Sequence, residues 1–240
     1  MRKIENKIKF GLVGCGMISK KHAEAIKEFP EAELVAVCDV IKERADNLAE
    51  KYNCKAYYNF DEMLKNGEID VISLATPSGL HSDMSIKSLK INKHVLCEKP
   101  MALNTEDTKK IIEAEKNSEG KFFLIKQNKY NPPIIAMKNA VYNKKLGELM
   151  MINSNVYWNR DENYYNRAKW RGTKDMDGGS LFTLASHFID LMIWTGGEVA
   201  SVKSIMKNFK HPEIETEDCS LVLLRFKSGA IGKLVVTTCT

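Results

Sequence analysis

A glycine-rich turn near the start of the chain is the first feature that could bind a ligand. Gly14 and Gly16 follow an apolar run and open a helical pattern. The first glycine permits a tight turn, the second lets the backbone approach a pyrophosphate, and the helix supplies N–H groups and the positive end of its dipole. Ser19 replaces the third glycine that is usual in such turns. We predict a dinucleotide-binding turn, with Met17 and Ile18 also in contact with the cofactor.

An acidic residue ends the next apolar run. Asp39 lies about 20 residues beyond the turn, where a carboxylate accepts hydrogen bonds from the adenosine ribose and repels a 2′-phosphate. Lys42 and Arg44 weaken that repulsion, which leaves NADP as an alternative. We expect NAD as the cofactor. The competing interpretation is a domain of the same fold that binds no nucleotide.

Two further polar segments follow apolar runs, at the strand ends where parallel sheets bind ligands. The first contains Thr76, Ser78 and His81, and the second contains Glu98 and Lys99. We expect all five residues to contribute to the cofactor site. Turn chemistry alone would also explain the first segment, and His81 would then simply begin a helix. A lysine placed against a positively charged nicotinamide ring gives up its proton more readily, so Lys99 is the candidate general base.

The elements that must position these residues alternate between apolar runs and helical patterns. This alternation predicts a doubly wound parallel sheet covered by helices on both faces. The expected strands are Ile8–Val13, Leu34–Val37, Ala56–Tyr58, Val71–Ala75, His94–Cys97 and Phe122–Ile125. The expected helices are Ser19–Glu28, Lys42–Lys51, Met84–Leu89 and Thr105–Lys116, the last capped by Thr105 or Asn104.

The pattern changes near residue 127, and we expect two domains: an α/β Rossmann domain over 1–126 and an α+β domain over 127–240. The second domain contains an open, largely antiparallel sheet. Its expected helices are Pro133–Tyr142 and Ser180–Trp194, with a loop over 159–179, and its expected strands are Leu149–Trp158, Val199–Met206, Ser220–Phe226 and Ala230–Thr237. The chain ends while this sheet is still being built, so we expect the second domain to be truncated.

Composition argues against several other classes of protein. The 240 residues carry a net charge of +5, but no basic run marks a nucleic-acid-binding arm. Six cysteines are scattered without a C-x-x-C pair, which favours reduced thiols and argues against a metal site. No apolar stretch approaches the roughly 20 residues that cross a bilayer, and the charged run from Met1 to Lys9 does not look like a signal peptide. We expect a cytoplasmic protein without nucleic-acid or membrane partners.

The motifs taken together resemble the Gfo/Idh/MocA oxidoreductase family. The resemblance is carried by the glycine turn, the acidic end of the second strand, Thr76-Pro77 and Glu98-Lys99-Pro100, and it covers essentially the whole chain. It implies a second domain whose open sheet often mediates oligomerisation. It also implies catalytic roles for Lys99 and for His187, the counterpart of the family's histidine. Many members carry an aspartate four residues earlier, but Thr183 stands there in this chain, which leaves Lys99 and His187 as the predicted proton relay.

Segments of the second half resemble one subgroup of this family, the UDP-N-acetylglucosaminuronate 3-dehydrogenases of bacterial surface-polysaccharide (lipopolysaccharide O-antigen) synthesis. These segments are Gln127–Pro133, Tyr157–Arg160, Trp170–Thr173 and Asp177–Asp190. The resemblance implies oxidation of the C3 hydroxyl of the nucleotide sugar to a ketone, which a partner aminotransferase then aminates. It also implies a homo-oligomer, a dimer or tetramer, built through the C-terminal sheet.

Several residues of the second half are candidates for ligand contacts. Arg160 and Arg171 suit a substrate carboxylate or diphosphate, because a guanidinium binds both in a bidentate manner. Tyr164 and Trp170 suit the nicotinamide or the sugar. We predict cofactor contacts for Gln127, Trp170 and Arg171, and substrate contacts for Lys99, Asn131, Arg160, Tyr164, Ser186 and His187. The competing interpretations are a surface loop around a buried indole, a helix start at Asn131, and a core or capping histidine at position 187.

Three other functions remain open at this stage. One is a different sugar or polyol dehydrogenase of the same family, of the inositol or glucose–fructose type. Another is a catalytically silent regulator that binds NAD or a sugar. The third is a truncated, inactive product. The presence of both Lys99 and His187 favours an enzyme, because a regulator has no need to retain either residue.

Overall fold

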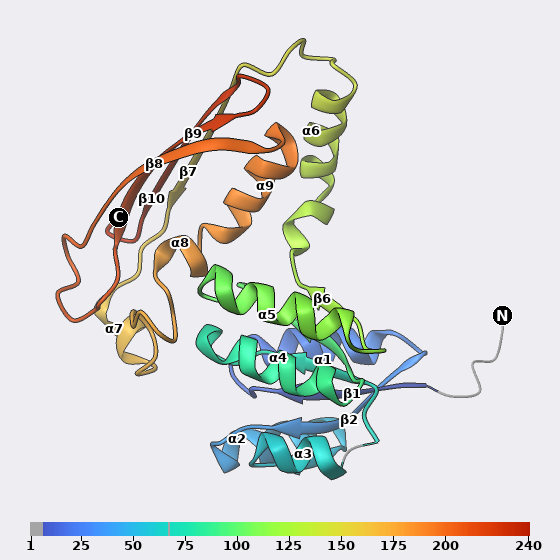
Figure 1. Ribbon diagram of the computed structural model, residues 1–240. Coiled ribbons are helices and arrows are strands. Elements are labelled where there is room, and N and C mark those ends of the chain that lie inside the picture. The colour runs from blue at the N-terminus through green and yellow to red at the C-terminus, as the bar shows by residue number, and fades with distance from the viewer. Residues whose placement is uncertain (1–6, 67) are drawn as a thin grey trace. The chain divides into compact units, whose positions relative to one another are not determined.

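The computed structural model describes residues 7–66 and 68–240, and the chain divides into two compact units, 1–125 and 126–240 (Figure 1). Residues 1–6 lie outside the described part, so the expectation drawn from the run Met1 to Lys9 falls mostly outside it. Each unit has a sheet and a hydrophobic core of its own and is described by itself.

The first unit contains a six-stranded sheet whose neighbouring strands all pair in parallel. The strand order is β3-β2-β1-β4-β5-β6, which is the dinucleotide-binding order with a switch point between β1 and β4. The strands are β1 Ile8–Val13, β2 Ala32–Cys38, β3 Lys55–Tyr57, β4 Val71–Leu74, β5 His94–Cys97 and β6 Phe122–Leu124. Every residue of β4 is buried, as expected for a strand with helices on both faces. The predicted α/β fold is confirmed.

Helices cover both faces of this sheet. They are α1 Ser19–Glu28, α2 Lys42–Tyr52, α3 Phe60–Asn66, α4 His81–Lys90 and α5 Thr105–Lys116, with a 3-10 turn, η1, at Ser78–Leu80. α1 and α2 contribute to one core cluster, and α3, α4 and α5 contribute to the other. Asn104 caps α5, since its side chain accepts the N–H of Asp107 at 2.8 Å. α3 was not predicted from the sequence.

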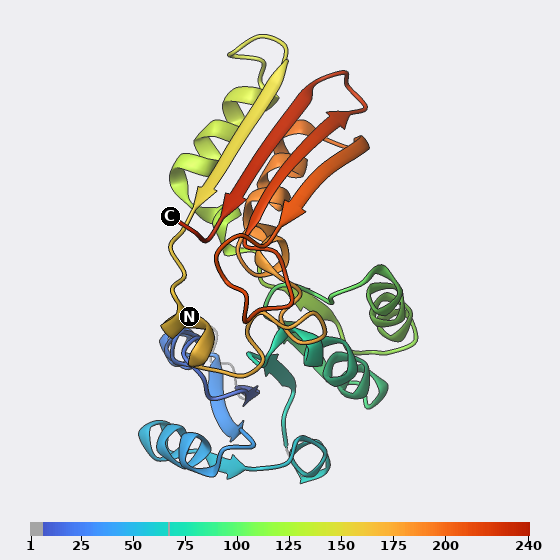
Figure 2. The same ribbon diagram turned by 90° about the vertical axis from the view of Figure 1, so that its left-hand side faces the viewer.

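The second unit contains a four-stranded sheet in the order β7-β10-β9-β8 (Figure 2). β9 pairs antiparallel with both β8 and β10, whereas β10 and β7 run parallel, so the expectation of a largely antiparallel sheet is confirmed. The strands are β7 Met151–Tyr157, β8 Val199–Lys207, β9 Cys219–Phe226 and β10 Ile231–Thr237. The helices are α6 Pro132–Tyr142, α7 Glu162–Asn166, α8 Ser180–Thr183 and α9 Ser186–Gly196, preceded by a 3-10 turn, η2, at Gln127–Tyr130.

The region around His187 differs from the prediction of one helix over Ser180–Trp194. The structure has two helices, α8 and α9, because the N–H groups of Leu184 and Ala185 both turn back to the carbonyl of Ser180. Ala185 at the break is fully buried in the core of the unit. Thr183 therefore ends α8 and His187 lies in α9, so the expectation of one continuous helix over both residues is wrong. The predicted loop over 159–179 also contains a short helix, α7.

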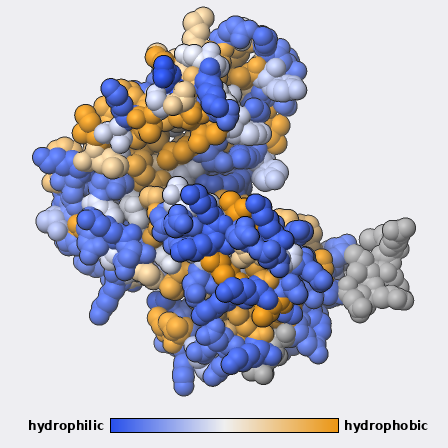
Figure 3. Space-filling model, in the orientation of Figure 1, coloured by the Kyte–Doolittle hydropathy of each residue, from blue (hydrophilic) through white to orange (hydrophobic). Residues whose placement is uncertain are grey.

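One face of the second sheet packs against α8 and α9, and the other face carries exposed apolar side chains among charged ones such as Lys203 and Arg225. Ile205, Leu223 and Ile231 are exposed by 74%, 52% and 49%. In the space-filling view, apolar residues gather in the part occupied by the second unit (Figure 3). Over the described residues, no helix has the length and apolar character needed to span a membrane.

Candidate active site

The glycine turn lies between the carboxyl ends of β1, β2 and β4. Gly14 has φ +90°, and its N–H donates to the carbonyl of Cys38 at 2.8 Å. A Cβ at this position would lie 2.5 Å from the carbonyl oxygen of Ala75. Only glycine combines this backbone angle with such a close approach, so the turn depends on Gly14 for its shape.

Asp39 connects the end of β2 to the glycine turn. One carboxylate oxygen accepts the N–H of Cys15 and the other accepts the N–H of Ile41, both at 2.8 Å. Each carboxylate oxygen has two lone-pair sites, so capacity remains for ribose hydroxyls. The predicted ribose ligand therefore also holds the turn that precedes α1.

The residues after the turn fit a dinucleotide. No atom lies within 4 Å of a Cβ built on Gly16, so the space above this residue is open. Ile18, the N-cap residue of α1, provides no side-chain cap for the first helical N–H groups. Uncapped N–H groups at the start of a ten-residue helix, beside an open glycine, suit a pyrophosphate. Met17, predicted to contact the cofactor, is 70% exposed beside this space.

His81 joins the two polar loops at this edge of the sheet. Its ring is 1% exposed, with Nδ1 at 2.7 Å from the carbonyl oxygen of Pro100 and Nε2 at 3.0 Å from that of Thr76. Burial lowers the pKa of His81, although both carbonyl contacts act in the opposite direction. A neutral ring donates to only one carbonyl at a time. His81 thus holds the two loops together. Ser78 is also buried, and the predicted contacts of both residues with the cofactor remain predictions.

Lys99 follows directly after β5 and Glu98. The Glu98 carboxylate accepts the backbone N–H of Lys99 at 3.1 Å and lies 3.2 Å from Nε2 of His22 on α1. His22 was not predicted as a site residue from the sequence. The available signal was a polar residue on the apolar stripe of α1, next to Ala23 and within one turn of Ile26, both of which are buried.

In the second unit, three lysines hold α9, the helix that begins with Ser186 and His187. Lys126 Nζ donates to the carbonyl of Ser186 at 3.0 Å, and Lys129 Nζ lies 2.9 Å from Asp190 Oδ1. Lys138 Nζ donates to the carbonyl of Trp194 in the last turn, where a cation also complements the helix dipole. None of these three lysines was predicted as a site residue from the sequence.

Gln127 and Asn131, two predicted ligand contacts, lie in and just after η2. Asn131 occupies the N-cap position of α6, but its side chain makes no capping hydrogen bond. The competing interpretation, in which Asn131 is a simple helix cap, requires a capping hydrogen bond that the structure does not have. Its predicted contact with substrate is untested.

Two arginines stack on one tyrosine in the segment around α7. The guanidinium carbons of Arg160 and Arg171 lie 4.4 Å and 4.0 Å from the ring centre of Tyr164. Arg160 also lies over Trp158 and Arg171 over Trp170, at 4.8 Å and 5.8 Å. The Nε atoms of both arginines are buried without a hydrogen-bond partner. Among residues 7–66 and 68–240, no carboxylate forms an ion pair with either guanidinium. The structure thus brings together Arg160, Tyr164, Trp170 and Arg171, all predicted as ligand contacts.

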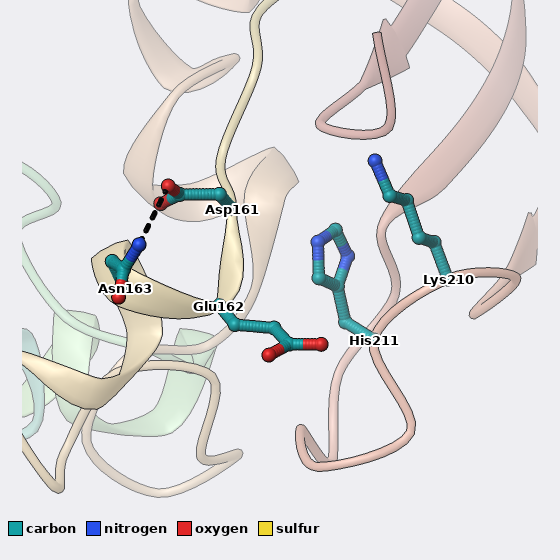
Figure 4. A pocket seen from close by; sticks show the side chains of 5 residues that line it. All are labelled: Asp161, Glu162, Asn163, Lys210 and His211. Atoms are coloured by element: carbon teal, nitrogen blue, oxygen red, sulfur yellow. Dashed lines mark hydrogen bonds between the residues drawn. The ribbon is translucent and has the colours of Figure 1, made fainter.

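A pocket of about 250 Å³ opens near this segment, lined by Asp161, Glu162, Asn163, Lys210 and His211 (Figure 4). His211 also belongs, with Asp218 and Cys239, to a group whose side chains have metal-ligand chemistry. The Asp218 carboxylate already accepts the N–H groups of Phe209 and Lys210 at 2.9 Å and 2.8 Å, and Nδ1 of His211 lies 3.1 Å away. Burial alone would raise the pKa of Asp218, but these N–H groups hold it below its usual value. Asp218 thus anchors the loop that contains Phe209 and Lys210.

The chain is similar to known oxidoreductases along its described length. The model of an oxidoreductase family with an NAD-binding Rossmann fold matches residues 8–125, and the model of the GFO/IDH/MocA C-terminal domain matches residues 134–240. A curated myo-inositol 2-dehydrogenase from Thermotoga maritima is 28% identical over 232 residues, which is 94% of this chain and 67% of that protein.

Two solved structures are also similar. The WlbA dehydrogenase from Bordetella pertussis, in complex with NADH and UDP-GlcNAcA, has a TM-score of 0.96 and 38% identity over 98% of this chain and 68% of its own. The WlbA dehydrogenase from Chromobacterium violaceum, with the same two ligands, has a TM-score of 0.94 and 37% identity over 99% of this chain and 69% of its own. This chain thus spans about two thirds of the length of the proteins it matches.

Proposed function

Because the chain belongs to the Gfo/Idh/MocA oxidoreductase family and contains its NAD-binding Rossmann domain, we propose that it oxidises the C3 hydroxyl of UDP-N-acetylglucosaminuronate with NAD. The observation that carries this choice of substrate is the pair of guanidinium groups stacked on Tyr164. It is supported by the similarity to two structures that contain UDP-GlcNAcA.

The charge of the arginine pair favours an acidic nucleotide sugar over a neutral polyol. Two half-buried guanidinium groups without a carboxylate partner in the described part of the chain are costly unless an anion binds them. A uronate and a diphosphate each match the guanidinium in a bidentate way. Inositol, the substrate named for the Thermotoga maritima relative, has neither group. An inositol-type activity is therefore the second choice.

The proposed chemistry removes a proton from the C3 hydroxyl and a hydride from C3, which leaves a ketone. Lys99, at the carboxyl end of β5, accepts the hydroxyl proton. His187, at the start of α9, passes that proton on. Gly14, Gly16 and Asp39 hold NAD, which supplies the hydride acceptor when bound.

We infer that the chain also forms a homo-oligomer through the outer face of the second sheet. Ile205, Leu223 and Ile231 on that face are about half exposed or more, and large apolar side chains left exposed on a sheet face are often covered by a partner. Sedimentation velocity tests this inference, since a monomer at micromolar concentration would exclude the homo-oligomer.

The 3-keto product is a substrate for an aminotransferase, in keeping with a place in surface-polysaccharide synthesis.

The direct test incubates the chain with stoichiometric NAD and UDP-N-acetylglucosaminuronate. We expect NADH absorbance to appear together with a nucleotide sugar lighter by two hydrogens. The Bordetella pertussis dehydrogenase serves as the assay control, and myo-inositol and glucose 6-phosphate serve as competing substrates. Turnover of myo-inositol alone would favour the second choice. Binding of both ligands without any turnover, with the control active, would favour a silent or incomplete protein.

Replacing Arg160 by Gln should raise the KM for the nucleotide sugar by about ten- to a hundredfold with little change in kcat, because a charge-assisted contact is worth about 1.5–3 kcal/mol. The matched control is Arg167→Gln, which removes an exposed arginine just after α7. Initial rates at varied substrate and saturating NAD measure the effect. An unchanged KM in the Arg160 variant would remove Arg160 from the substrate site.

A further inference from the structure

A chain of hydrogen bonds runs across the first unit from α1 to the residue before Lys99. His22 on α1 is 7% exposed, with Nδ1 at 2.8 Å from Ser73 Oγ on β4 and Nε2 at 3.2 Å from Glu98 Oε1. The other oxygen of Glu98 accepts the N–H of Lys99 at 3.1 Å. Because α1 also follows the glycine turn, this series of hydrogen bonds links the cofactor-binding helix to the loop that carries the candidate base.

The chemistry of Glu98 determines the direction of these bonds. Burial alone would raise the pKa of Glu98, but the hydrogen bond and charge of His22, together with Lys99, hold that pKa below its usual value. An ionised carboxylate only accepts hydrogen bonds, so Nε2 of His22 must be the donor. In the neutral ring, Nδ1 then accepts the hydroxyl hydrogen of Ser73. Both charge states of His22 thus keep the same contact with Glu98.

A nucleophilic role for this trio is excluded by burial. Ser, His and a carboxylate in hydrogen-bonded order resemble a hydrolytic triad. However, Ser73 lies inside β4 and is fully buried, so no substrate reaches its hydroxyl. The group next to the trio is Lys99, which follows Glu98 in the sequence and donates its N–H to the Glu98 carboxylate.

We propose that His22 is a positioning residue that holds the Glu98 carboxylate on the α1 side of its loop and thereby sets how readily Lys99 accepts a proton. The proposal rests on the proposed function for the role of Lys99. His22 Nε2 lies 3.2 Å from Glu98 Oε1, and both side chains are largely buried. The charges of Glu98 and Lys99 already act on each other, and once the His22 contact is lost the carboxylate is able to rotate closer to the ammonium of this lysine. An ion pair there stabilises the protonated lysine and weakens it as a base.

The other titratable groups around Glu98 do not replace His22. His81, at the start of α4, and the thiol of Cys97, on β5, both feel the charge of Glu98. His81 directs both ring nitrogens to backbone carbonyls. Burial raises the pKa of Cys97 so far that its thiol stays protonated, and that thiol donates to the carbonyl of Glu98. Neither side chain contacts the carboxylate.

Two substitutions of His22 separate positioning from packing. The amide nitrogen of Gln reaches about as far as Nε2 and preserves the contact with Glu98, whereas that of Asn reaches only as far as Nδ1. Competitive acylation of the NAD-bound chain at a series of pH values, followed by mass spectrometry of the Lys99 peptide, reports the protonation of Lys99 without turnover. We expect the labelling midpoint of His22→Asn to rise by about one pH unit and that of His22→Gln to match the unchanged protein. Equal midpoints in all three proteins would overturn the proposal, and so would equal shifts in both variants.

Glu98→Gln gives a second test that does not depend on how the fold tolerates changes at His22. Removing the carboxylate charge should lower the Lys99 labelling midpoint, and in this background His22→Asn should have no further effect, since the two residues act through one contact. An unchanged midpoint in Glu98→Gln would overturn the proposal.

Turnover distinguishes this inference from the proposed function. With an active enzyme, the rise of kcat with pH should move upwards in His22→Asn and not in His22→Gln. If no nucleotide sugar is oxidised but the labelling difference persists, the substrate assignment fails and the positioning role stands. If turnover is present and the labelling midpoints coincide, the positioning role fails alone.

Discussion

Replacing Lys99 by Met is expected to lower kcat with the nucleotide sugar by about 10²- to 10⁴-fold, the usual contribution of a general base. NAD affinity should remain close to that of the unchanged protein, because the glycine turn and Asp39 hold the dinucleotide from other strands. The side chain of Met has a similar length and no proton-accepting nitrogen, so the loss reports the chemistry and not a cavity. Single-turnover formation of NADH and tryptophan fluorescence titration with NAD measure the two quantities.

Lys99→Arg makes this test specific for proton transfer. Arginine keeps the positive charge but does not deprotonate in proteins. If Lys99 only supplied charge to the site, the Arg variant would retain much of its activity. We expect it to be as inactive as the Met variant. Lys90→Met, at the exposed end of α4, is the matched control and should behave like the unchanged protein.

Gly16→Ala is expected to weaken NAD binding by about ten- to a hundredfold, or about 1.4–2.8 kcal/mol, without changing the thermal midpoint of the free protein. A Cβ at Gly16 meets nothing within 4 Å in the structure. The methyl group would instead occupy the space that a bound pyrophosphate needs. Isothermal titration with NAD and thermal unfolding of the free protein measure the two effects. Unchanged NAD affinity would mean that the dinucleotide does not cross this turn.

Gly14→Ala is the contrasting variant in the same turn. Its Cβ would approach the backbone of Ala75 to 2.5 Å, and alanine is strained at φ +90°. These two effects should cost about 2–5 kcal/mol of unfolding free energy. We therefore expect Gly14→Ala to lower the thermal midpoint of the free protein, which Gly16→Ala leaves unchanged. Equal midpoints for the two variants would contradict this division of roles.

Much of the first unit could be predicted from the sequence because its signals are local. Buried parallel strands are continuous apolar runs, and the polar residues that end them meet at one edge of the sheet in any doubly wound fold. The positions of Asp39 and Lys99 followed from this rule alone. α3 was missed although Phe60, Met63 and Leu64 have helical spacing, because a seven-residue helix offers only one such repeat.

Contacts between distant segments could not be predicted. The partners His22 and Glu98 are 76 positions apart in the sequence, and no spacing rule connects them. The start of α8 also depends on a distant residue. Glu217, in the loop between β8 and β9, accepts the hydroxyl of Ser180 and the N–H of Leu181, which fixes the start of α8. The sequence between 180 and 194 reads as one apolar helix without that information.

The bond between Asp39 and the N–H of Cys15 has a consequence for cofactor engineering. The carboxylate that would exclude a 2′-phosphate is also the acceptor that secures the glycine turn. Exchanging Asp39 for a small neutral residue, the usual route towards NADP, would therefore loosen the pyrophosphate site in the same step. Cofactor preference and cofactor affinity are linked traits in this chain. A designer who wishes to change one of them must first supply a new acceptor for Cys15.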